Sequence, residues 1–112
     1  MKTPTFDANG YPTQDTLDAL QAWPITDAAG ALDFLVAAWH RTYGSIHDLS
    51  AEEAAVCQAR SGDRFLRLAT GGWSGNEDLI DALRGGLVWS LTWRLSASGG
   101  LVIFGYPPAL EK

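Results

Sequence analysis

The side chains with the most obvious chemical potential in this sequence are two histidines and one cysteine. His40 and His47 lie seven positions apart, Asp48 follows the second, and Cys57 lies ten positions after His47. Structural zinc sites usually take paired ligands at spacings of about two to five residues, a pattern that is missing here. A histidine that acts as a general acid or base needs an oriented nucleophile or carboxylate, and no motif indicates one. We therefore expect no metal site, no cofactor and no catalytic residue, and the alternative is a small hydrolase-like enzyme that uses His40 or His47.

A second candidate is the glycine-rich segment at residues 71–76, Gly-Gly-Trp-Ser-Gly-Asn, which joins a predicted strand to a predicted helix. Free amides at a helix start favour an anion, and glycines let a ligand approach the backbone. Neither nucleotide-binding loop pattern fits, because the Lys-Ser/Thr ending and the Gly-x-Gly-x-x-Gly spacing are both missing. The alternative is a purely structural turn in which Ser74 caps the helix and Trp73 packs on the core. The residues predicted to bind a ligand or partner are Gly71, Gly72, Trp73, Ser74 and Asn76.

Two arginines extend this predicted binding surface. Arg67 and Arg94 alternate with apolar neighbours in two predicted strands, so both should project from the sheet face opposite the buried side chains. Two guanidinium groups on one surface could hold a carboxylate or a phosphate. The alternative is that both are solvated or pair with nearby acids such as Glu77 and Asp78.

The five tryptophans fall into two groups. Trp39, Trp89 and Trp93 occupy predicted core positions. Trp23, next to a proline, and Trp73, in the glycine-rich segment, have no obvious burial. Exposed tryptophans are favoured anchors at protein interfaces, so these two are the better candidates for contact with a partner.

The first half of the chain is predicted to be helical after an N-terminal arm, residues 1–12, that ends in a turn at residues 9–12. Thr13 is the predicted cap of a short helix that Pro24 stops. Asp27 is the predicted cap of a second helix, whose apolar residues at spacings of three and four run to an end at Gly44. Ser50 opens a capping-box pattern with Glu53, and the third helix should reach about Arg60 and close at Gly62.

The second half combines strands and one helix. Residues 65–70 alternate as a half-buried strand should, and Ser74 with Glu77 matches a capping box for a helix that ends before Gly85. Residues 87–95 are apolar at every odd position, which predicts a strand with Trp89, Leu91 and Trp93 on one covered face. Residues 96–100 form a hairpin loop, and residues 101–106 return as the last strand. The fold class is α+β, in the order α-α-α-β-α-β-β, with helices on one face of a small antiparallel sheet.

Composition narrows the functional classes. A chain of 112 residues with 46% hydrophobic and 19% charged residues predicts one folded domain, residues 1–112, and excludes disorder. The net charge of -5 opposes binding to nucleic acid in general and to anionic membranes. The 13 acidic residues are too scattered for a mimic of DNA. A single cysteine, no membrane-length apolar run and no signal-peptide pattern predict a cytoplasmic protein.

A set of residues spread over most of the chain also resembles a known group of proteins. The set consists of the string at residues 71–77 and of Phe6, Asp7, Gly10, Tyr11, Pro12, Thr13, Leu17, Trp23, Ile80, Leu83, Trp89, Trp93, Ser98, Gly99, Gly100 and Phe104. In these residues the sequence is similar to small uncharacterised proteins encoded by tailed phages and prophages. One departure is Leu101, where these proteins tend to have His or Tyr. The resemblance implies a small accessory protein in a bacterial host cell, and we expect a binding protein, rather than an enzyme, that engages a host or phage protein or a small anionic ligand through residues 71–76.

Overall fold

The computed structural model describes residues 3–42, 44–47, 49–57 and 64–106, and its fold class is α+β, as predicted. Its four-stranded antiparallel sheet has the order β1-β2-β4-β3. The strands are β1 (Ser45–His47), β2 (Arg64–Ala69), β3 (Trp93–Ala97) and β4 (Leu101–Tyr106). The helices are α1 (Gln14–Gln21), the 3-10 turn η1 (Ile25–Asp27), α2 (Ala28–Ala38), α3 (Ala51–Val56), α4 (Ser74–Arg84) and α5 (Leu87–Thr92).

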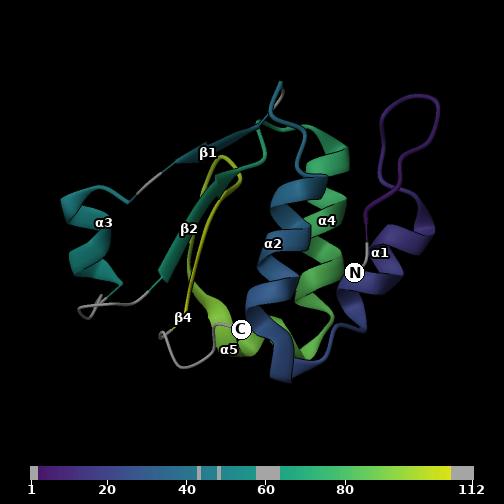
Figure 1. Ribbon diagram of the computed structural model, residues 1–112. Coiled ribbons are helices and arrows are strands. Elements are labelled where there is room, and N and C mark those ends of the chain that lie inside the picture. The colour runs from purple at the N-terminus through teal and green to yellow at the C-terminus, as the bar shows by residue number, and fades with distance from the viewer. Residues whose placement is uncertain (1–2, 43, 48, 58–63, 107–112) are drawn as a thin grey trace.

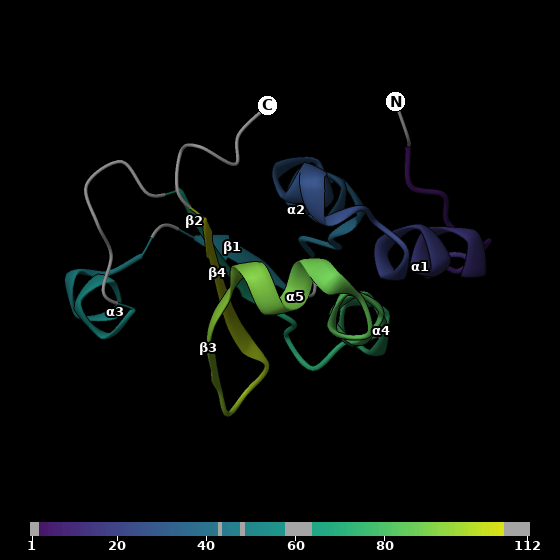
Figure 2. The same cartoon turned by 90° about the horizontal axis from the view of Figure 1, so that it is seen from below.

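Helices lie on both sides of this sheet. The helices α1, α2 and α4 lie together on one side, whereas α3 lies on the other (Figure 1), and the view in Figure 2 shows the same separation. The larger core is on the first side, where Leu68, Val102 and Phe104 of the sheet pack with Leu35 of α2 and Leu79 of α4. The prediction that the helices gather on one face is therefore correct except for α3.

The first two helices begin after the predicted N-cap residues, Thr13 and Asp27, but the end of α2 was predicted wrongly. The hydroxyl of Thr13 accepts a hydrogen bond from the backbone N–H of Thr16, as a cap should. Asp27 occupies the N-cap of α2 but makes no capping hydrogen bond, because its carboxylate accepts one from Nε1 of Trp23. The helix ends at Ala38 and not at Gly44, since the chain turns extended at Trp39.

The third helix begins where the sequence predicts. Ser50 and Glu53 form a complete capping box, with the Ser50 N–H donating to the Glu53 carboxylate and the Glu53 N–H donating to the Ser50 hydroxyl. Helix α3 ends at Val56, with Cys57 as a half-buried C-cap, so it is shorter than predicted. Its predicted end near Arg60 and Gly62 lies outside the described residues. The three-residue strand β1, which pairs with the end of β2, lies between the predicted second and third helices, where the sequence predicted no strand.

Strand β2 and helix α4 confirm the strand predicted over residues 65–70 and the helix predicted to end before Gly85. The predicted capping box at the start of α4 is wrong, because the N-cap residue is Trp73 and Ser74 is the first residue of the helix. Without an Ser/Thr/Asp/Asn cap, the first turn of α4 depends on contacts with other segments. Those contacts include hydrogen bonds of Ser74 with Tyr11 and of Asn76 with His40 and Thr70.

The predicted strand over residues 87–95 is also wrong, because residues 87–92 form helix α5 and only then does β3 begin. The buried residues of α5 are Val88 and Thr92, which are four positions apart, and the Thr92 hydroxyl donates to the Val88 carbonyl at 2.8 Å. Trp93, predicted to be covered, is 40% exposed. Burial of one helical stripe between the other elements outweighs the alternating pattern, and of the three residues predicted to be covered only Trp89 and Leu91 pack, partly buried, against the core.

Candidate binding surface

Trp73 lies at the centre of three packed aromatic rings. Its indole stacks on Tyr11, with ring centroids 4.8 Å apart and an interplanar angle of 29°. On another side it meets the His40 ring at 4.7 Å in an edge-to-face arrangement of 61°. We call Tyr11, His40 and Trp73 the aromatic cluster. It joins the N-terminal segment, the chain after α2 and the start of α4, which are far apart in the sequence.

The glycines of residues 71–76 have two different roles. Gly71 and Gly72 adopt φ values of 68° and 77°, which favour glycine, and both are exposed. Gly75 lies under the Trp73 indole, and a Cβ at this position would overlap the ring. The first pair therefore makes the turn, whereas Gly75 lets the indole lie flat against the first turn of α4.

Asn76 is completely buried, although the sequence analysis placed it among the contact residues. Its side-chain oxygen accepts from the backbone N–H of His40 at 2.9 Å. Its side-chain nitrogen donates to the carbonyls of His40 at 3.2 Å and Thr70 at 3.3 Å. The two bonds with His40 also explain the early end of α2, since the backbone of His40 pairs with a side chain. From its buried position, the side chain of Asn76 therefore connects the start of α4 to the backbone at His40 and Thr70.

The other loop residue predicted to bind, Ser74, is exposed at the rim of the cluster. Its hydroxyl donates to the Tyr11 hydroxyl at 3.4 Å. Tyr11 is held from its own side by Asp7, whose carboxylate accepts from the backbone N–H groups of Asn9 at 2.8 Å and Tyr11 at 3.0 Å. The sequence analysis missed Tyr11 as a site residue, and the only available signal was an aromatic residue inside an Asn-Gly-Tyr-Pro turn.

Neither predicted arginine joins the aromatic cluster. Arg67 faces α3, on the other side of the sheet, where its Nε lies 2.8 Å from the Glu53 carboxylate. The backbone N–H of Ser50, and then Arg67, lower the pKa of Glu53 below its usual value. Arg94 lies at a bulge in β3 and donates to the carbonyls of Leu91 and Trp93. The predicted surface of loop and arginines is therefore divided between two sides of the sheet.

A groove of about 480 Å³ adjoins the aromatic cluster at His40. Phe6, which is 46% exposed, forms part of its apolar wall. Arg41 is exposed and makes no ion pair with any residue that the structure describes. Trp39 is buried in the wall, and its Nε1 has no hydrogen-bond partner among the described residues. Among the described residues, the lining consists of Phe6, Gly10, Ala38, Trp39, His40, Arg41 and Thr42, none of which carries a carboxylate.

The metal-ligand types of the sequence are not gathered at this surface. Within residues 3–42, 44–47, 49–57 and 64–106, no three His, Cys, Asp or Glu side chains are arranged to hold a metal ion. His47 is in β1, where its backbone pairs with that of Arg67, and its side chain lies outside the described part. Burial raises the pKa of the Cys57 thiol above its usual value. Of the two candidate histidines, His40 has a described side chain, and this side chain contacts the glycine-rich segment at Trp73.

Comparisons with known proteins identify no relative. None of the helices in the described ranges combines the length and apolar character needed to cross a bilayer. The resemblance to small phage-encoded proteins stays a prediction, since no family model, no curated protein and no solved structure matches this chain.

Proposed function

We propose that this protein is a binding protein that engages a partner protein through the aromatic cluster and the adjoining groove. The observation that carries this proposal is the packing of Trp73 between Tyr11 and His40. Tryptophan and tyrosine are enriched among the residues that contribute most of the binding energy at protein interfaces. The resemblance to small phage-encoded proteins favours a host or phage protein as the partner.

The way the rings are held favours recognition. A side chain that is already fixed loses little conformational freedom when it binds, and so more of its contact energy appears as affinity. Trp73 is fixed by two rings and by the close approach of Gly75. Tyr11 is fixed by a ring and by hydrogen bonds within its turn. The cluster therefore offers a preformed apolar contact surface on an otherwise acidic protein.

The groove beside the cluster indicates the charge of the group it would receive. Arg41 and the hydrogen-bonding side chains of His40 and Thr42 line it, and none of its lining residues that the structure describes is acidic. An acidic side chain of the partner would meet a guanidinium group there, and such charge-assisted contacts add specificity. A small anionic ligand, the other possibility raised by the sequence, would use the same groove.

The proposal is tested by capture of partners from bacterial lysate, followed by calorimetric titration of the captured protein. Trp73→Ala should weaken binding by about 2 kcal/mol or more, as expected for an anchor. Trp93→Ala is the matched control, because Trp93 is a 40% exposed tryptophan outside the cluster. Equal affinities for wild type and a folded Trp73→Ala variant would refute the proposal.

The enzyme hypothesis now concerns His40, because this residue both contacts Trp73 and lines the groove. It is tested with a panel of activated esters and phosphoesters. Hydrolysis by the wild type that disappears in His40→Ala, with the fold retained, would favour an enzyme over a binding protein.

A further inference from the structure

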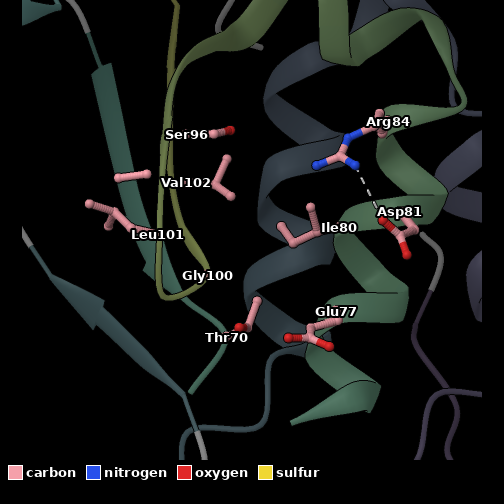
Figure 3. A pocket seen from close by; sticks show the side chains of 10 residues that line it. Thr70, Glu77, Ile80, Asp81, Arg84, Ser96, Gly100, Leu101 and Val102 are labelled. Carbon is pink, nitrogen blue, oxygen red and sulfur yellow. Dashed lines mark ion pairs between the residues drawn. The ribbon is translucent and has the colours of Figure 1, made fainter. Parts of the chain in front are cut away.

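A second cleft lies away from the aromatic cluster, between α4 and the β3–β4 hairpin (Figure 3). Its volume is about 260 Å³. The apolar part of its wall is formed by Ile80 and Val102, which are 3% and 4% exposed, together with Leu101. Because Ile80 and Val102 belong to the core, this wall is held in place by the fold itself.

The hairpin turn fixes the cleft at the end near Thr70. The Thr70 N–H donates to the Gly100 carbonyl at 3.1 Å. Gly100 has a φ of 81°, and a Cβ there would overlap the Thr70 hydroxyl, so the turn packs directly on this residue. The cleft is therefore preformed and not dependent on a ligand to shape it.

Three charged side chains of α4 line the cleft at spacings of four and three residues, and therefore on one helix face. Asp81 and Arg84 pair with each other at 3.6 Å, and the guanidinium carbon of Arg84 also lies 5.0 Å from the centre of the Trp89 ring. Glu77 makes no hydrogen bond or ion pair through its carboxylate with any described residue. Figure 3 shows its side chain directed toward the hairpin. The described lining of the cleft thus carries two carboxylates and one guanidinium group, an excess of one negative charge, and the guanidinium group of Arg84 already pairs with Asp81.

We propose that this cleft binds the side chain of a lysine residue from a partner protein. The methylene stem would lie on Ile80 and Val102, while the ammonium group meets the carboxylate of Glu77. The size agrees with this ligand, since pockets for drug-sized molecules begin near 300 Å³ whereas this cleft has about 260 Å³. An anion is disfavoured because Arg84 is held by Asp81 and Trp89.

The test is a titration of the whole protein with Nα-acetyl-lysine methylamide, followed through the backbone amide signals in a ¹H–¹⁵N spectrum. Saturable shifts should centre on Thr70, Glu77, Gly100 and Val102. Nα-acetyl-norleucine methylamide, which has a similar apolar stem and no ammonium group, should bind at least about tenfold more weakly. Equal affinity for the two compounds would overturn the proposal.

Two charge variants separate a specific contact from attraction to an acidic protein. Glu77→Gln should weaken lysine binding about tenfold. Asp78→Asn removes the same charge one residue away, at an exposed position that does not line the cleft, and should change the affinity less than about twofold. An equal loss in both variants would show non-specific attraction and overturn the proposal. Tighter binding of the free diamine cadaverine than of the lysine amide would overturn the assignment to a lysine residue.

Discussion

Replacing Asn76 with alanine should destabilise the protein strongly, because this buried side chain connects three segments. It makes three hydrogen bonds, two with the backbone of His40 and one with the carbonyl of Thr70. At about 1 kcal/mol each, their loss lowers the free energy of unfolding by about 3 kcal/mol, and the backbone groups left behind remain buried. A domain of this size has about 5–15 kcal/mol in total, so the effect is a large part of its stability.

Urea unfolding followed by tryptophan fluorescence measures this loss. With a slope of about 1–3 kcal/mol per molar urea, the midpoint should fall by about 1–3 M. Asp78→Asn, an exposed change on the same helix, is the control and should stay within about 0.5 kcal/mol of wild type. A loss below about 1 kcal/mol in Asn76→Ala would refute the argument that Asn76 holds the binding surface together.

Asn76→Asp adds a pH test of the same contact. In this variant one carboxylate oxygen can still accept from the His40 N–H, but the other faces the carbonyl oxygens of His40 and Thr70. Burial and repulsion by these two oxygens should raise the pKa of the carboxyl group in the folded state. A raised folded pKa means that the native state binds the proton more tightly than the unfolded state does. The free energy of unfolding should therefore fall as the pH rises from the unfolded pKa to the folded pKa of the introduced carboxyl group. Relative to wild type, the variant should therefore be less destabilised at about pH 4 than at about pH 7.

Three further outcomes are expected. Gly75→Ala should displace the indole of Trp73, which circular dichroism in the aromatic region would detect, whereas an unchanged spectrum would contradict the close approach. The pKa of Glu53 is lowered chiefly by the Ser50 N–H, so the ionised carboxylate stabilises the fold at neutral pH and this effect is lost on acidification. The difference in unfolding free energy between wild type and Glu53→Gln should therefore shrink as the pH falls from about 5 to about 3. Cys57, whose pKa is raised by burial, should react with iodoacetamide more slowly than an unstructured cysteine peptide at neutral pH, and equal rates would be the contrary result.

The features that the sequence predicted correctly are mainly those determined by interactions between residues that are close in the sequence. Thr13 and Ser50 cap helices through bonds to residues three positions later, so the pattern alone is enough. Residues 87–95 show the opposite case, since their odd positions suit a strand while Val88 and Thr92 suit a helical stripe. The choice between them depends on contacts of α5 with α2, α4 and β4, which no local pattern contains.

The candidate surface was predicted only in part for the same reason. Trp73 was identified because a tryptophan in a glycine-rich segment has no obvious burial and exposed tryptophans favour interfaces, and the structure places it among other rings. Tyr11 and His40 reach it from distant parts of the chain, and the sequence carries no sign of that meeting. The burial of Asn76 was equally hidden, because its partners are backbone groups and any residue type offers those.

The position of β4 has a consequence for synthesis of the chain. It is the last of the strands that the structure describes, yet it lies between β2 and β3, and its pairing with β2 joins residue 64 to residue 106 and residue 69 to residue 101. On the ribosome, helices α1, α2 and α4 emerge before the strand that completes the sheet they cover. Their apolar faces therefore lack a full sheet until β4 has also been synthesised, and a chain truncated before Leu101 is expected to need a chaperone or to aggregate.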